Sequence, residues 1–172
     1  MKKTFIFVTT LIILAGMILF FPATTALVIS NRKNQSEKII TRAGFENGFI
    51  ISYTHSVNKG RVHDYYKSAE KNQLELYQTE FVSYGAGIPE PYETPGAVFE
   101  VTDDGYFIKN LHRVLPRLVM AVGVIANHSI TIGSSMTDSR ELFLTEYFPP
   151  QTSLIFENRR VSLFDIITNK NI

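Results

Sequence analysis

The chain has 172 residues, of which 45% are hydrophobic, so it can hold one packed domain of ordinary size plus an apolar leader or anchor. Its formal net charge is +1 and no basic stripe is interleaved with aromatic residues, which argues against a nucleic-acid partner. It contains no cysteine, which excludes disulfide bridges, thiolate metal sites and cysteine nucleophiles.

An uncharged apolar run occupies residues 4–21, directly after two lysines. Its length of about 18 residues is close to what a helix needs to span a bilayer core. Pro22 ends the run, and residues 23–26 are a poor signal-peptidase site, so a cleaved signal and a retained anchor are both open. We favour a signal-anchor helix over residues 1–25 and an extracytoplasmic β domain over residues 26–172. Because positive charge stays in the cytoplasm, the lysines make this a single-pass protein of the cell membrane with its C-terminal domain outside.

The chain after residue 26 has the pattern of many short strands separated by turn residues. Aromatic and β-branched residues favour strand, and no stretch keeps a helical period for three turns. We therefore predict an all-β fold, a single small antiparallel sandwich or barrel-like domain, with helix confined to the anchor. The predicted strands are residues 26–29, 38–41, 49–57, 62–66, 74–82, 99–101, 106–109, 117–124, 128–132, 141–144, 153–156 and 161–164, with a break at 158–159.

The most informative stretch is the predicted hairpin at the centre of the chain, whose first strand alternates between an apolar and a polar face. A glycine-containing turn at residues 58–61 sets its register. This register places His55 opposite Asp64 and Tyr53 opposite Tyr66 on the apolar face. We therefore expect His55 and Asp64 to form one inward-facing, hydrogen-bonded unit.

Three roles are open for this pair. A carboxylate that orients an imidazole can act in acid–base catalysis, the two groups can contact a ligand, or they can be a buried structural pair. We favour the structural role and predict no enzymatic activity. Ser56 follows His55, but neighbouring strand residues point to opposite faces, and the chain has no Gly-x-Ser-x-Gly elbow of a serine hydrolase.

The histidines also raise the question of a metal site. The available ligands are His55, His63, Asp64, His112 and His128. None of them has the close spacing of a metal motif, and His63 should face away from Asp64. We predict no metal and no cofactor. His128 shares the alternation of its apolar neighbours and is expected to point inward.

A glycine-rich loop follows the predicted strand at 74–82. Gly85 and Gly87 flank an alanine and precede two spaced prolines, which rules out a central strand. The loop can present backbone N–H groups to a carboxylate, or its glycines can simply supply positive φ angles. The candidate ligand-binding residues are His55, Asp64, Tyr53, Tyr66, Gly85, Gly87 and His128.

Three features resemble the bacterial domain of unknown function 1850: the Tyr-x-His-Ser-Val strand at residues 53–57, the acidic strand after a short turn with Val62, Asp64 and Tyr66, and the Gly-Ala-Gly-x-Pro loop at residues 85–89. The resemblance extends over roughly residues 26–165. In two places the chain departs from the family pattern: Gly60-Arg61 replaces Thr-Pro, and His63-Asp64 replaces two glutamates. The resemblance implies a small extracytoplasmic domain that works with TAXI-type TRAP transporters of organic acids, through the permease or its substrate-binding protein, and implies no activity.

Two classes of function remain open. The first is a membrane-anchored accessory domain that binds a partner. The second is a carboxylate-binding or hydrolytic domain that uses His55, Asp64 and the glycine loop. A polar cleft joining these residues would favour the second class, and a filled core with an apolar surface patch elsewhere would favour the first.

Overall fold

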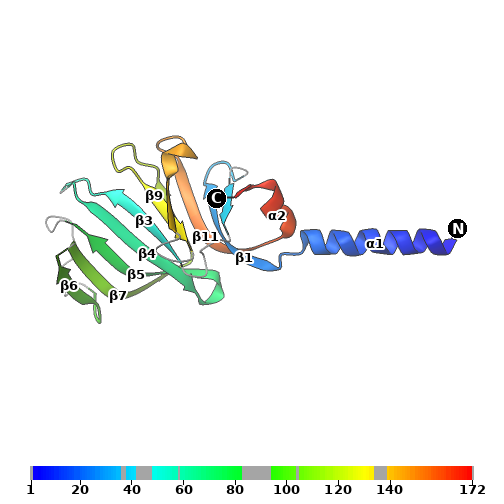
Figure 1. Ribbon diagram of the computed structural model, residues 1–172, viewed down its shortest axis with the longest axis horizontal. Coiled ribbons are helices and arrows are strands. Elements are labelled where there is room, and N and C mark those ends of the chain that lie inside the picture. Colours follow the sequence, from blue (N-terminus) through cyan, green and yellow to red (C-terminus); the bar gives the residue numbers. More distant parts are fainter. Residues whose placement is uncertain are drawn as a thin grey trace.

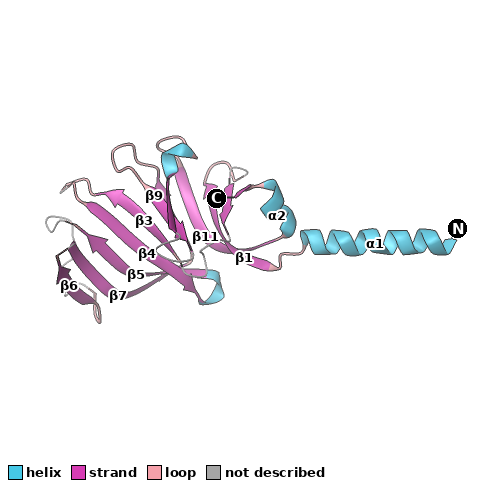
Figure 2. Cartoon of the chain, viewed as in Figure 1, coloured by secondary structure: helices cyan, strands magenta, loops and turns pink. Residues whose placement is uncertain are grey.

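The computed structural model describes residues 2–35, 38–41, 48–57, 59–82, 94–103, 105–133 and 139–171. One long helix, α1 (Lys2–Phe20), projects from a domain built of two β-sheets (Figures 1 and 2). The predicted all-β domain after an N-terminal helix is confirmed. The helix has no buried residue and is long and apolar enough to cross a membrane, a property shared by membrane anchors and signal sequences.

Two sheets face each other as a sandwich. The smaller sheet has five strands in the order β12-β2-β1-β11-β8, and the larger has seven in the order β10-β9-β3-β4-β5-β7-β6. Among the described residues, neighbouring strands pair antiparallel, except β12 and β2, which are parallel. The smaller sheet comprises β1 (Thr24–Asn31), β2 (Lys38–Thr41), β8 (Leu118–Ala121), β11 (Ser153–Val161) and β12 (Lys170–Asn171). The larger comprises β3 (Phe49–Thr54), β4 (Arg61–Ala69), β5 (Gln73–Phe81), β6 (Val98–Thr102), β7 (Gly105–Leu115), β9 (Ser129–Gly133) and β10 (Ser139–Phe143).

Strand β1 is buried on both faces, which explains its uninterrupted apolar run. Leu27 and Ile29 belong to the core between the sheets, whereas Ala26 and Val28 belong to a second cluster on the outer face. Ile166 of the short helix α2 (Leu163–Thr168) packs against this outer cluster. The strands predicted at residues 26–29 and 38–41 are present as β1 and β2, which pair antiparallel.

The core between the sheets is filled by apolar side chains from both. The ring of Phe49 on β3 stacks on Tyr66 of β4 at 5.1 Å and on Phe156 of β11 at 6.4 Å between centroids. Asn158 of β11 donates from Nδ2 to Ser68 Oγ at 2.8 Å and so ties the far end of β4 to the smaller sheet. Aromatic contacts and a buried polar bond therefore fix how the two sheets face each other.

The C-terminal part of the chain corrects two predictions. Strand β11 runs through the expected break at residues 158–159, because it pairs with β1 from Leu154 to Val161. The predicted strand at residues 161–164 is wrong beyond Val161, where β11 ends, because residues 163–168 form α2; helix is therefore not confined to α1. The cause is a capping box: Ser162 Oγ accepts from the Asp165 N–H at 3.1 Å, and Asp165 Oδ2 accepts from the Ser162 N–H at 3.1 Å.

The predicted register of the central hairpin is wrong. In the structure Thr54 lies opposite Arg61, so Asp64 pairs with Ile51 and Tyr66 with Phe49. Strand β3 ends at Thr54 and β4 begins at Arg61, and the His55 N–H donates to the Gly60 carbonyl at 2.9 Å in the connection between them. This connection is centred two residues earlier in the chain than the predicted turn at residues 58–61, so each residue of β4 faces a residue of β3 four positions earlier than predicted.

Gly48, directly before β3, provides a test of this packing. It has φ +88°, and a Cβ atom there would lie 2.0 Å from the Tyr66 carbonyl oxygen. Gly96 has a similar φ of +83°, but a Cβ atom added to Gly96 would have no atom within 4 Å. We expect Gly96→Ala to lower the free energy of unfolding by about 1 kcal/mol, for the left-handed backbone alone. Gly48→Ala should cost about 3 kcal/mol or more, because β3 and β4 must also separate. Urea denaturation measures both, and equal losses would contradict the close approach at Gly48.

Candidate functional site

A half-buried carboxylate is the centre of the first candidate site. Asp64 lies on the core side of β4 and faces Thr79, its direct neighbour on β5. Its Oδ1 accepts a short hydrogen bond from Thr79 Oγ1, and the carboxylate also accepts from the Tyr53 hydroxyl. Tyr53 is partly buried and packs against two buried apolar clusters. Two hydroxyl groups therefore hold Asp64 inside the sandwich, where an unpartnered carboxylate would be costly.

The electrostatics of this group follow from burial. Burial raises the pKa of Asp64, and the weaker effects of the Thr79 hydrogen bond, the Arg113 charge and the Tyr53 hydrogen bond oppose it. Burial and the charge of Asp64 raise the pKa of Tyr53 to about 12, and the same two causes raise the pKa of Tyr66. Tyr53 therefore stays a protonated hydrogen-bond donor at neutral pH.

Strand β7 brings Arg113 close to this cluster. Lys109 pairs with Gln78 and Arg113 with Leu76, so the three residues between them on β7 form a bulge opposite one residue of β5. Asn110 and His112 in this bulge have φ angles of 59° and 47°. Arg113 follows the bulge, is exposed to solvent, and its charge acts on Asp64.

Four of the predicted site residues lie in or beside this cluster. Tyr53, Asp64 and Tyr66 form it, and the ring of His128 lies 5.8 Å from the ring of Tyr53. The Gly123 N–H donates to His128 Nδ1 at 2.9 Å. Burial and the charge of Arg61 lower the pKa of His128, so its imidazole is neutral with the proton on Nε2.

The remaining predicted residues are elsewhere. His55 lies in the β3–β4 loop, where its Nδ1 accepts from the Val57 N–H at 3.3 Å. The expected His55–Asp64 unit is therefore wrong, because the hairpin register separates the two residues and hydroxyl groups take the place of the imidazole. Gly85 and Gly87 lie outside the described residues.

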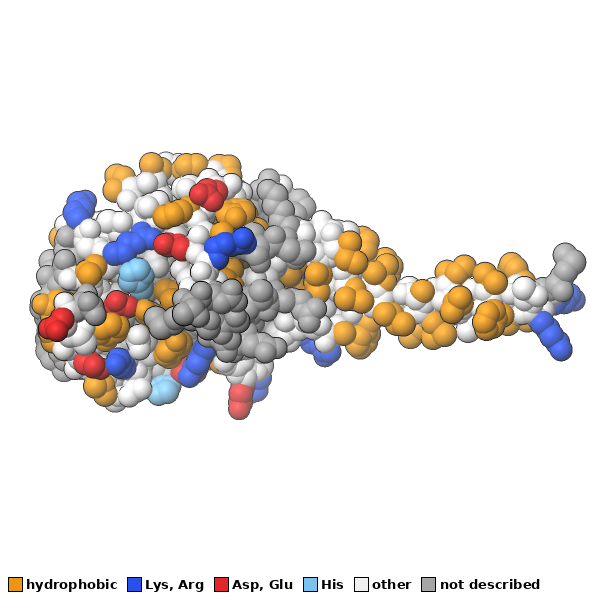
Figure 3. Space-filling view, in the orientation of Figure 1, with side chains coloured by type: hydrophobic (Ala, Val, Ile, Leu, Met, Phe, Trp, Pro, Cys, Tyr) orange, Lys and Arg blue, Asp and Glu red, His pale blue; other side chains and the backbone are white. Residues whose placement is uncertain are grey.

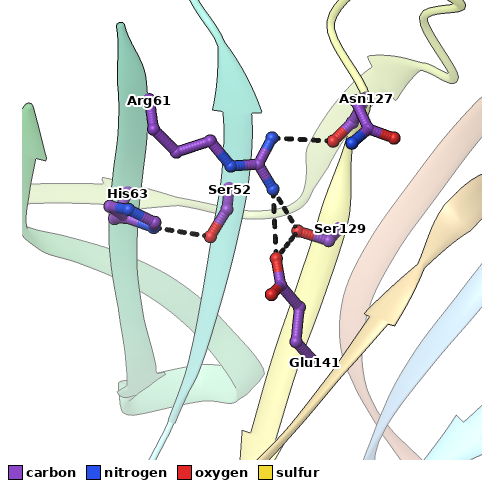
Figure 4. A network of polar contacts seen from close by, with 6 residues as sticks. All are labelled: Ser52, Arg61, His63, Asn127, Ser129 and Glu141. Carbon is purple, nitrogen blue, oxygen red and sulfur yellow. Dashed lines mark hydrogen bonds and ion pairs between the residues drawn. The ribbon is translucent and has the colours of Figure 1, made fainter.

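A second polar network covers the outer face of the larger sheet (Figure 4). The Arg61 guanidinium donates to the Asn127 carbonyl at 2.8 Å, to Ser129 Oγ at 2.7 Å and to Glu141 Oε1 at 3.0 Å. Ser129 Oγ donates to the same carboxylate oxygen at 2.5 Å. The hydrogen bond from Ser129, together with Arg61, lowers the pKa of Glu141 against the opposing effect of burial. One cation thus joins β4, the β8–β9 loop, β9 and β10.

The network includes a serine–histidine contact that resembles a catalytic dyad. Ser52 Oγ and His63 Nδ1 are 2.7 Å apart, and burial lowers the pKa of His63. However, the Ser52 side chain lies mid-strand, directly opposite Ser129, in a residue that is only 1% exposed. A nucleophile must reach its substrate, so this contact is structural. His63 does face away from Asp64, as predicted, because it points to the opposite side of β4.

The fourth histidine lies on the β5–β7 surface. His112 Nδ1 is 2.8 Å from Glu75 Oε1, and Lys67 Nζ lies 3.2 Å from the same oxygen. Burial acts to raise the pKa of Glu75, but the bonds from His112 and Lys67 lower it overall. Within the described ranges, no group of three or more His, Asp or Glu side chains is placed to hold a metal ion.

Several residues of the Asp64 cluster and of the Arg61 network could not be identified as site residues from the sequence. The partners of Arg61 lie 66 to 80 residues further along the chain, too far for any local pattern. Thr79 could have been found only with the correct register of β4 and β5. In contrast, the period-two alternation did separate Ser52 from the face of Tyr53.

Comparison with protein families gives one match, to the family described as Domain of unknown function (DUF1850), over residues 49–138. This segment begins at β3 and contains Asp64, Thr79, Arg61 and Ser129, and it is shorter than the span expected from the resemblance. Searches of curated proteins and of solved structures gave no match.

The raised pKa of Asp64 predicts a pH dependence of stability. Between the unfolded-state pKa of about 4 and the higher folded-state pKa, the unfolded chain loses the Asp64 proton while the folded chain keeps it. Stability should therefore fall as pH rises through this window, by up to about 1.4 kcal/mol per pH unit, and level off above it. Asp64→Asn should remove this component. Urea denaturation across pH measures the difference between the two proteins, and Asp103→Asn, in an exposed turn, controls for the loss of one charge.

The Arg61 network predicts that a lysine cannot replace the guanidinium. Lysine cannot match the planar geometry that serves three acceptors at once, so Arg61→Lys should lower the free energy of unfolding by about 1–2 kcal/mol. Lys109, which pairs with Glu100 near the surface, is the matched control, because Lys109→Arg should change stability by less than about 0.5 kcal/mol. Similar small effects for both variants in thermal unfolding would contradict the bridging role of Arg61.

Proposed function

Because this chain belongs to the DUF1850 family, we propose that it is a membrane-anchored extracytoplasmic accessory domain that binds a partner protein and has no enzymatic activity. The family resemblance favours a TAXI-type TRAP transporter for organic acids as the system with which it works. The observation that carries the proposal is an apolar patch on two loops remote from α1.

The helix α1 supports the anchoring part of the proposal. Its 19 residues correspond to about 28 Å of helix, close to the roughly 30 Å thickness of a bilayer hydrocarbon core. Lys2 and Lys3 precede its apolar part, and lysines at the start of a spanning helix stay in the cytoplasm. The β domain then lies outside.

The absence of enzymatic activity is supported by how the reactive groups are used. Asp64 accepts hydrogen bonds from Thr79 and Tyr53, and Ser52 is buried in a strand. The His55–Asp64 arrangement that a hydrolytic or carboxylate-binding function would need is absent, because the hairpin register separates them.

The loop patch consists of Val57 in the β3–β4 loop and Val124 and Ile125 in the β8–β9 loop. These side chains belong to residues that are 63%, 65% and 80% exposed. The two loops are held together, since the Thr54 N–H donates to the Ala126 carbonyl at 2.7 Å and Arg61 to the Asn127 carbonyl. Exposed apolar residues on a rigid support are typical of a protein-binding surface.

The position of the loop patch favours one of two partners. The patch lies on the side of the domain remote from α1 (Figure 1). If α1 is in the membrane, this side faces away from the bilayer. A permease is embedded in the bilayer, whereas a substrate-binding protein approaches from the extracytoplasmic solvent. We therefore favour the substrate-binding protein as the partner.

Aspartate substitutions in the loop patch test this function. We expect Ile125→Asp and Val57→Asp to abolish co-purification of the transporter's substrate-binding protein with the full chain from detergent-solubilised membranes, because a charge must then be desolvated in the interface. Val101→Asp is the matched control, since Val101 is also 63% exposed but lies on the edge strand β6. Thermal unfolding should be unchanged in all three variants. Loss of the partner in Val101→Asp as well, or retention in all variants, would contradict the proposed surface.

A further inference from the structure

The helix α2 has an apolar face that the domain does not cover. Ile166 packs against the outer cluster of β1, but Leu163, Phe164 and Ile167 are 42%, 42% and 72% exposed. Residues at positions i, i+1 and i+4 of a helix lie on one side, so these three side chains form a single face. An isolated helix of six residues would not form in water, and the capping box and the packing of Ile166 hold this one in place.

This face lies directly at the end of α1. The ring of Phe164 is 4.9 Å from the ring of Phe20, the last residue of α1. Residues 21–23 are the entire connection between α1 and β1, so the domain has little freedom to move away from the helix. Figure 3 shows hydrophobic side chains continuing from α1 onto the adjoining end of the domain.

The depth of this face in a membrane follows from the length of α1. If about 28 Å of helix spans a core of roughly 30 Å, Phe20 lies at the boundary between acyl chains and headgroups. Phe164, in contact with Phe20, must lie at the same depth. Arg160, an exposed residue opposite Thr25 at the start of β1, adds a cation near this level, where lipid phosphates lie.

We propose that α2 is an interfacial helix whose face of Leu163, Phe164 and Ile167 inserts into the boundary region of the bilayer beside α1. The domain then rests on the lipid surface through two contacts, a spanning helix and an inserted face. This inference rests on the proposed function in one respect, the retention of α1 as an anchor. It assigns the exposed face to lipid and not to a protein partner.

The chain has no tryptophan, so a single introduced tryptophan reports only its own surroundings. The experiment places Phe164→Trp, Ile167→Trp and, as a control in the loop patch, Val57→Trp separately in the full chain. Each protein is reconstituted in vesicles of phosphatidylethanolamine and phosphatidylglycerol, with and without bromine on the acyl chains. Phe164→Trp keeps an aromatic ring beside Phe20, so it provides a reporter even if Ile167→Trp fails to fold.

We expect the emission of the tryptophans at positions 164 and 167 to be shifted to the blue and strongly quenched by the brominated lipids. The emission of Val57→Trp should be neither shifted nor quenched. If the protein co-sediments with the vesicles but the tryptophans on α2 behave like that at position 57, the interfacial helix is refuted while the anchor stands. If mass spectrometry of the protein purified from cells finds α1 removed, both the anchor and this inference are refuted.

Discussion

The constraint on which the rest of the structure depends is that β1 must be covered on both faces. Its inner face, with Leu27 and Ile29, needs the larger sheet, and its outer face, with Ala26 and Val28, needs α2. Because β1 follows α1 after three residues, whatever covers its outer face must lie beside the end of α1. The apolar run of one strand thus determines both the sandwich and the position of α2 relative to α1.

Burial of one carboxylate imposes a second requirement, on the larger sheet. Asp64 needs hydrogen-bond donors in a region where the surrounding side chains are apolar, and Thr79 and Tyr53 supply them. On the opposite face of the larger sheet, Arg61 of β4 donates hydrogen bonds to Ser129 of β9 and Glu141 of β10. The larger sheet therefore has polar contacts on both faces. Its aspartate, glutamate and serine side chains, which could react in an active site, are instead used in hydrogen bonds that hold the strands together.

The sequence allowed the fold class, the strands at residues 26–29 and 38–41 and the two faces of β3 to be predicted, because all three depend on short-range periodicity. The register of β3 and β4 could not be predicted, since it depends on where the ladder stops, and His55 has no residue pattern that marks it as a loop residue. Helix α2 did have a signal, Ser162 followed three residues later by Asp165, but the neighbouring valine and phenylalanine favoured a strand. The Arg61 network brings together residues from distant parts of the chain, and no local pattern encodes that.

The pairing of β1 with β11 has a consequence for the order of folding. Thr24 pairs with Val161, a separation of 161 − 24 = 137 residues, so this ladder can close only after residues 154–161 have been synthesised. Until then the apolar strand next to α1 lacks β11 as a partner. Pairings this distant in sequence close slowly, because a large loop entropy opposes them. The domain therefore matures late, because β1 cannot complete its pairing until β11 has been synthesised.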